Sequence, residues 1–173
     1  FAGGEDESRL KNLDMAKIDP AVVRGFLLNG TKEELSDFIQ EYVGGLYEAA
    51  ASKMFCQYLA LNVRFTAIAY LESLGLKQED FLEELPGVSS AGTQVKREEL
   101  GNYIHEVLGR ALDLRDLESR SQGKDMIRQA VEYINLHYAD ENLSLREVAG
   151  YTNVSANYFS AVFSQEMQQT FVE

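Results

Sequence analysis

Hydrogen-bonding side chains with helical spacing lie between residues 155 and 166, and they offer recognition chemistry rather than catalysis. Opposite the apolar residues Phe159, Val162 and Phe163, a helix here presents small and polar side chains. An asparagine amide can form two hydrogen bonds with an adenine edge, and a serine hydroxyl can bond a base or a phosphate. We take as candidate DNA contacts Ser155, Ala156, Asn157, Ser160, Ala161 and Ser164.

The sequence does not have the residue spacing of a catalytic or metal-binding site. His105 and His137 stand far apart, and neither has a cysteine or histidine at ligand spacing. Cys56 lies in an apolar run, where an inert, buried thiol is expected. No phosphate-binding loop and no nucleophile motif is present. We therefore expect no enzyme activity, and we assign no catalytic, cofactor-binding or metal-binding residue.

Two short helices joined by a tight turn must position the candidate contacts. Leu145 and Val148 lie at i and i+3 on the apolar face of the first helix. Asn153 tolerates the left-handed conformation and can turn the chain, and Ser155 is a suitable N-cap for the second helix. This pattern is typical of a helix-turn-helix, whose second helix enters the major groove of DNA. An ordinary helical corner within a core is the alternative.

Residues 125–173 resemble the first half of an AraC-type DNA-binding domain. The matching pieces are A-x-x-Y-I in the leading helix, LSL-x-x-VA, N-V-S-x-x-YFS-x-x-F and a final QTF. The resemblance implies a second such module after a long linking helix, so we expect this chain to be a fragment. In the family the positions that match Ala161 and Ser164 are often basic, whereas residues 155–166 here contain no Lys or Arg.

The segments FLLNGTKEELSDFI and ALDLRD are similar to the central region of YesN-type response regulators. This looser resemblance covers about a further hundred residues. It implies a phosphorylatable receiver domain before Phe1, a sensor histidine kinase as a partner, and a helical region that relays the signal by dimerising.

The whole sequence predicts an all-α protein, with a helical bundle at 1–122 followed by a three-helix helix-turn-helix module at 123–173. Asp19-Pro20 predicts a helix start and Asn29-Gly30 predicts its end. Thr31 to Glu34 fit a capping box for the next helix. Further helices are predicted at 52–75, 77–85, 95–119 and 126–138, with a loop at 86–94 and a linker at 119–124.

The helix predicted at 52–75 is apolar on more than one face. Burial inside a bundle explains this pattern, and so does contact with a partner chain. The candidate dimer interface consists of Phe55, Tyr58 and Phe65. A small-ligand pocket lined by Tyr58, Phe65 and Tyr70 is a third explanation.

The net charge of −12 limits what the chain can do with DNA. Lys and Arg neutralise phosphates, and residues 123–173 hold only three basic side chains against seven acidic ones. We expect this module alone to bind DNA weakly. The single cysteine fits a reducing compartment, and no apolar run approaches the ~18 residues of a membrane span. A cytoplasmic protein without a membrane partner is expected.

The sequence thus favours a sequence-specific DNA-binding transcription regulator of a two-component phosphorelay. The expected partners are DNA, a second copy of the chain and a sensor histidine kinase, and no cofactor is expected. Two alternatives stay open. One is a regulator whose region 9–121 binds a small effector directly, and the other is a helical protein-interaction module that no longer binds DNA.

Overall fold

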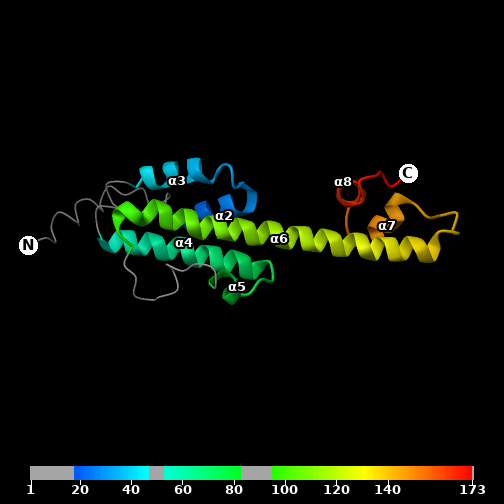
Figure 1. Ribbon diagram of the computed structural model, residues 1–173, viewed down its shortest axis with the longest axis horizontal. Helices are drawn as coiled ribbons and strands as arrows, with labels where there is room; N and C mark the ends of the chain where they lie inside the picture. Colours follow the sequence, from blue (N-terminus) through cyan, green and yellow to red (C-terminus); the bar gives the residue numbers. More distant parts are fainter. Residues whose placement is uncertain (1–17, 47–52, 83–94, 173) are drawn as a thin grey trace, which may run out of the picture. The chain divides into compact units, whose positions relative to one another are not determined.

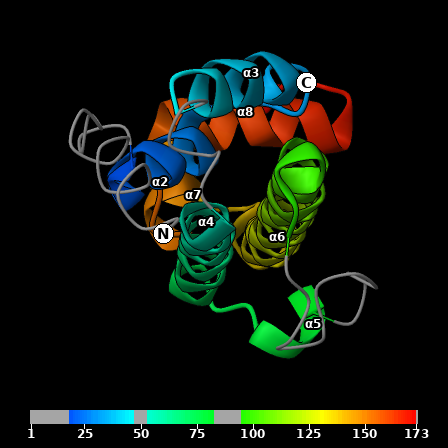
Figure 2. The same ribbon diagram turned by 90° about the vertical axis from the view of Figure 1, so that its left-hand side faces the viewer.

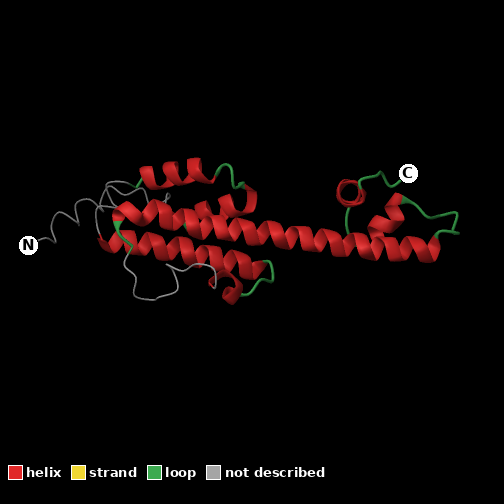
Figure 3. Ribbon diagram, viewed as in Figure 1, coloured by secondary structure: helices red, strands yellow, loops and turns green. Residues whose placement is uncertain are grey.

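The computed structural model describes residues 18–46, 53–82 and 95–172, and these residues form helices and turns with no strand among them (Figures 1 and 3). The all-α prediction is confirmed. The chain divides into two compact units, residues 1–115 and residues 116–173. The helices are α2 (Pro20–Asn29), α3 (Leu35–Gly44), α4 (Lys53–Ser73), α5 (Gln78–Leu82), α6 (Arg97–His137), α7 (Leu145–Tyr151) and α8 (Ala156–Met167).

Helix α2 starts and ends where the sequence predicts. The Asp19 carboxylate accepts a 2.8 Å hydrogen bond from the backbone N–H of Ala21, and Pro20 opens the first turn. The helix ends at Asn29, but Gly30 has a φ of −78° and is therefore not a left-handed C-terminal glycine. Glycine is required there for a different reason, because a Cβ atom would overlap the ring of Phe26.

The capping box between α2 and α3 forms only in half. The Glu34 carboxylate accepts hydrogen bonds from the backbone N–H and the hydroxyl of Thr31, at 3.0 and 3.2 Å. The hydroxyl of Thr31 therefore donates to a side chain instead of capping the backbone, and α3 begins at Leu35.

The turn between α2 and α3 is fastened to α6 by two charged side chains. The Lys32 ammonium lies 2.6 Å from the Asp113 carboxylate. The Arg115 guanidinium donates to the carbonyls of Leu27 and Gly30, at 2.7 and 2.9 Å. The last carbonyls of a helix have no partner within it, so Arg115 completes the hydrogen bonding at the end of α2.

The core of the first unit forms where α4 runs alongside the first part of α6, with α2 and α3 on one side of this pair and α5 on the other (Figures 1 and 2). Helix α4 ends at Ser73, and Gly75 follows with a φ of +84°, a conformation that suits glycine. The loop predicted at 86–94 lies outside the described residues. Fully buried core side chains include Leu59, Val63 and Leu71 from α4, Phe81 from α5, and Leu100, Ile104, Leu108 and Leu112 from α6.

The predicted interruption of α6 at residues 119–124 is wrong. One helix of 41 residues runs from Arg97 to His137 through the serines and the glycine that suggested a linker. Gly123 is buried, and a Cβ atom placed on it would lie 3.4 Å from Cγ1 of Val162 on α8. Gly123 therefore lies at the contact between α6 and α8 within the second unit, with room for a small side chain.

No helix in the described part of the chain is both long enough and apolar enough to span a bilayer.

Candidate nucleic-acid interface

A tight turn with a complete set of backbone hydrogen bonds joins α7 to α8. Asn153 has a φ of +65°, the left-handed conformation that its residue type predicts. The N–H of Val154 donates to the carbonyl of Ala149 at 3.0 Å, and the N–H of Asn153 donates to the carbonyl of Gly150 at 3.1 Å. These two bonds form a Schellman motif, which satisfies carbonyls at the end of a helix and reverses the chain. The Thr152 hydroxyl adds bonds to the carbonyls of Val148 and Ala149.

Serine residues start both short helices. The hydroxyl of Ser144 accepts from the N–H of Glu147 at 3.3 Å, and the hydroxyl of Ser155 accepts from the N–H of Tyr158 at 3.2 Å. Each bond supplies a partner for an N–H group that the first turn of a helix leaves free. Ser155 is therefore primarily a cap, and it keeps its hydroxyl hydrogen for a further partner.

Helix α8 is held by its aromatic face. Phe159 and Phe163 are buried, and the ring of Phe171 meets both edge-on at centroid distances of 6.0 and 5.6 Å. Val162 is half-buried beside them, so the predicted apolar face is the face that packs. The other buried residues of this core are Ile127 and Ala130 from α6, with Val148 and Ala149 from α7.

A second aromatic group fixes α7 on the end of α6. The ring of Tyr133 stacks between those of His137 and Tyr151, at centroid distances of 4.1 and 4.3 Å. The Tyr133 hydroxyl donates to the Glu147 carboxylate at 3.0 Å, and this hydrogen bond raises the pKa of Tyr133. The aromatic stack and this hydrogen bond together fasten α7 to the end of α6 within the second unit.

The predicted DNA contacts are divided between the outer face of α8 and its flanks. Asn157 and Ala161 are exposed, as is Ser155, whereas Ser160 and Ser164 are half-buried. Ala156 packs partly against the core, so its methyl group is not fully available to a ligand. Asn157 and Ala161 thus form the centre of the uncovered face.

Two exposed α8 side chains were missed by the sequence analysis. Gln165 lies one turn beyond Ala161, at the same spacing that separates Ala161 from Asn157, and it carries a second amide. Tyr158 is 51% exposed next to Asn157. The four-residue spacing of 157, 161 and 165 was a usable signal for Gln165. Tyr158 could not be separated by its residue type from the aromatic residues of the core.

None of the basic side chains in this unit belongs to α8. Arg120, Lys124 and Arg128 belong to α6 and Arg146 belongs to α7, and all four are exposed. Arg128 also forms a 3.2 Å ion pair with Asp125, which offsets its charge. The uncovered face of α8 therefore offers amide and hydroxyl groups without a cation.

The residues proposed for a dimer interface are divided between the core and the surface of α4. Tyr58 is 50% exposed and Phe65 is 61% exposed, so both rings are open to a partner. Phe55 is only 6% exposed, and its inclusion in an interface has to be corrected because its ring belongs to the core of its own unit. Tyr70 is buried as well, which removes it from the pocket suggested with Tyr58 and Phe65.

Groups that could hold a metal ion are absent from the described ranges, where no three His, Cys, Asp or Glu side chains come together. Cys56 is 1% exposed, and burial raises the pKa of its thiol, against the opposing effect of Arg97. The thiol is therefore protonated at neutral pH, the form in which cysteine reacts slowly.

Comparison with protein-family models, with curated proteins and with solved structures finds no match to this chain.

Proposed function

We propose that the chain is part of a cytoplasmic transcription regulator, and that α8 is a recognition helix that enters the major groove of DNA. The observation that carries this proposal is the turn at Asn153, which joins two short capped helices and leaves Asn157, Ala161 and Gln165 uncovered on α8. Asparagine and glutamine amides can each form two hydrogen bonds with an adenine edge.

The charge of the second unit supports weak binding to DNA. Contacts between basic side chains and DNA phosphates supply most of the affinity of DNA-binding proteins, and α8 has no basic side chain. We expect the chain to bind duplex DNA with little sequence preference, near the 10⁻⁴–10⁻⁶ M range of non-specific binding.

The regulator that we propose belongs to a two-component phosphorelay, with a receiver domain, a sensor histidine kinase and dimerisation through the first unit. This part rests on the resemblance of the segments containing Phe26 to Ile39 and Ala111 to Asp116. The exposed rings of Tyr58 and Phe65 support the dimer.

A charge-addition experiment tests the position of the DNA interface. Ala161→Lys places a cation at the centre of the uncovered face of α8, and Gln129→Lys adds the same charge to an exposed site on α6. We expect Ala161→Lys to tighten duplex binding at least about threefold more than Gln129→Lys, because a local phosphate contact adds to the general charge effect. Fluorescence anisotropy at low salt measures both affinities.

NMR spectra of the wild-type chain provide the second readout. Adding a duplex should shift the side-chain amide signals of Asn157 and Gln165 and leave that of Asn142, in the turn before α7, in place. Equal effects of the two lysines, or no shift on α8, would support the protein-interaction module instead.

A further inference from the structure

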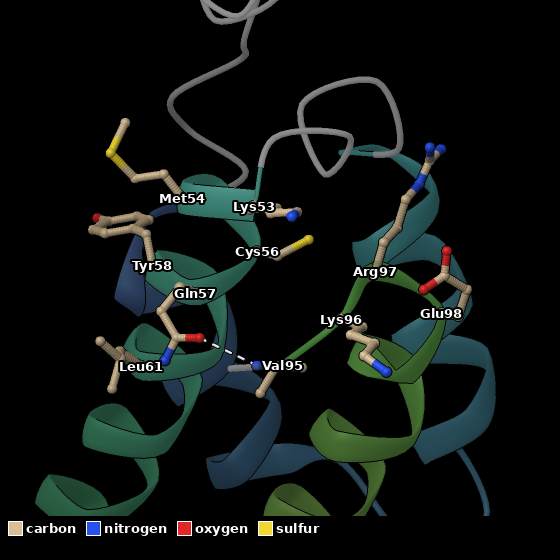
Figure 4. Close-up of a pocket in the computed structure, with 10 residues that line it drawn as sticks. All are labelled: Lys53, Met54, Cys56, Gln57, Tyr58, Leu61, Val95, Lys96, Arg97 and Glu98. Atoms are coloured by element: carbon tan, nitrogen blue, oxygen red, sulfur yellow. Dashed lines mark hydrogen bonds between the residues drawn. The ribbon is translucent and has the colours of Figure 1, made fainter. Parts of the chain in front are cut away.

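A pocket in the first unit opens between the start of α4 and the start of α6. Its volume is about 970 Å³, at the upper end of the range of small-molecule sites. Figure 4 shows Lys53, Cys56 and Gln57 on one side and Val95 to Glu98 on the other, with the sulfur of Cys56 directed between them. The Gln57 side-chain oxygen accepts a 3.2 Å hydrogen bond from the N–H of Val95 and so ties the two walls together.

The charges that line this pocket oppose the charge of the chain. Among the described residues that line it, three are cations, Lys53, Lys96 and Arg97, and one is a carboxylate, Glu98, although the chain as a whole carries −12. Lys53 and Lys96 are exposed, and neither ammonium group has an ion-pair partner among the described residues. The pocket is therefore a local positive site on an acidic protein, and it attracts anions.

The remaining wall of the pocket is apolar. Met54, Tyr58 and Leu61 lie along α4 and Val95 faces them, and three of these side chains are among the exposed large hydrophobic groups of the unit. An inorganic anion would use only the cations. A molecule with a hydrocarbon body and one acidic group would use both parts of the pocket, because burying apolar surface adds about 25 cal/mol per Å².

We propose that this pocket binds a small organic anion with an apolar body, of the class of medium-chain carboxylates, and that Lys53 and Lys96 hold its acidic group. The first unit then binds a small molecule, and this binding does not depend on the proposed binding of DNA by α8.

Octanoate and octanol form a matched pair of probes for isothermal titration calorimetry with the complete chain. They share a hydrocarbon body and differ in the charge of the head group. We expect octanoate to bind saturably at one site and at least tenfold more tightly than octanol. Acetate, which has the charge without the body, should bind much more weakly than octanoate.

Two double variants locate the binding site. Lys53→Gln with Lys96→Gln should weaken octanoate binding at least fivefold and leave octanol binding unchanged. Lys77→Gln with Lys124→Gln makes the same change of charge at exposed residues outside the pocket, and it should leave octanoate binding within twofold of the wild type. Lys53→Arg with Lys96→Arg should retain the affinity.

The proposal is overturned if octanoate does not bind saturably, if octanol binds equally well, or if both glutamine variants lose the same affinity. Circular dichroism verifies that each variant is folded. Because Tyr58 and Leu61 also lie on the exposed face of α4, the titrations are run at a concentration where light scattering gives a single mass.

Discussion

At Asn153 the residue type and the backbone conformation agree. The residue has a φ of +65°, and its turn provides hydrogen bonds for the carbonyls of Ala149 and Gly150. A side chain branched at Cβ resists this conformation, because its second substituent crowds the backbone. Asn153 thus helps to set the position of α8 relative to α7, together with the packing of Phe159 and Phe163.

We expect Asn153→Val to destabilise the second unit by about 1–2 kcal/mol, the cost of forcing a β-branched residue into a left-handed conformation. Asn153→Gly should cost less, because glycine adopts this conformation freely. Hydrogen exchange of the backbone amides in α7 and α8, followed at increasing denaturant concentration, measures the free energy of unfolding of the second unit in both variants. An unchanged midpoint for the valine variant would contradict the role given to the turn.

Tyr42 is a buried tyrosine with an unsatisfied hydroxyl. It is 6% exposed, and its hydroxyl has no hydrogen-bond partner among the described residues. Burial raises the pKa of Tyr42 to about 12. Leaving a polar group buried without a partner costs about 1–3 kcal/mol, so removing the hydroxyl should stabilise the protein.

Tyr42→Phe is expected to raise the free energy of unfolding by about 1 kcal/mol at neutral pH. Above pH 10 the tyrosine loses its proton in the unfolded protein but keeps it in the folded protein. Deprotonation therefore favours the unfolded state, and the free energy of unfolding of the wild type falls as the pH rises from 10 toward 12. The advantage of the phenylalanine variant should therefore widen between pH 10 and pH 12. Denaturant titrations at several pH values measure it, and a gap that narrows would argue against the buried hydroxyl.

Helices with strong local signals were predicted well from the sequence. Asp19-Pro20 and Ser155 specify helix starts through their own backbone and side-chain bonds, and those starts are found in the structure. Helix α6 was predicted as two helices because the glycine and serines of residues 119–124 are typical of a linker. Gly123 instead lies against Val162, a contact between residues 39 positions apart that no local pattern reveals.

In the candidate sites too, features that depend on one helix could be predicted, and features that depend on distant segments could not. The polar face of α8 could be predicted because its spacing is a property of one helix. Whether Phe55 or Phe65 faces the solvent depends on which helices surround α4, and the sequence of α4 alone, with apolar residues on most sides, does not decide it. The same holds for the pocket between α4 and α6, which lies between segments about 40 residues apart.

The exposed stripe on α4 gives a prediction about self-association. Met54, Tyr58, Leu61 and Phe65 follow one another at intervals of four, three and four residues, the spacing of a helix that pairs with another helix, and all are exposed. We expect Phe65→Glu to leave the protein folded and monomeric, because a charge at a helix seam is costly to bury.

Phe55→Glu is the matched control on the same helix. Its ring is in the core, so the charged variant should unfold the first unit instead of changing the mass of a folded protein. Light scattering and circular dichroism distinguish the two outcomes. A wild-type chain that is monomeric at about 100 μM, well above the micromolar range of a functional association, would dispose of the dimer.

At the scale of the whole molecule, the described residues form two hydrophobic cores that have no residue in common. One core includes Leu59 and Leu108 in the first unit, and the other is built around Phe159 and Ile127 in the second. Helix α6 supplies side chains to both. The pocket and helix α8 therefore each belong to a separately packed unit.

This separation has an evolutionary consequence. A substitution that loosens the packing of Phe159 couples energetically to residues of its own core and not to Leu59, because the two cores share no residue. Natural selection can therefore change the ligand preference of one unit while the other accumulates neutral substitutions at its own pace. Descendants of such a chain are free to diverge at different rates in the two units, with the boundary between them falling within the single helix α6.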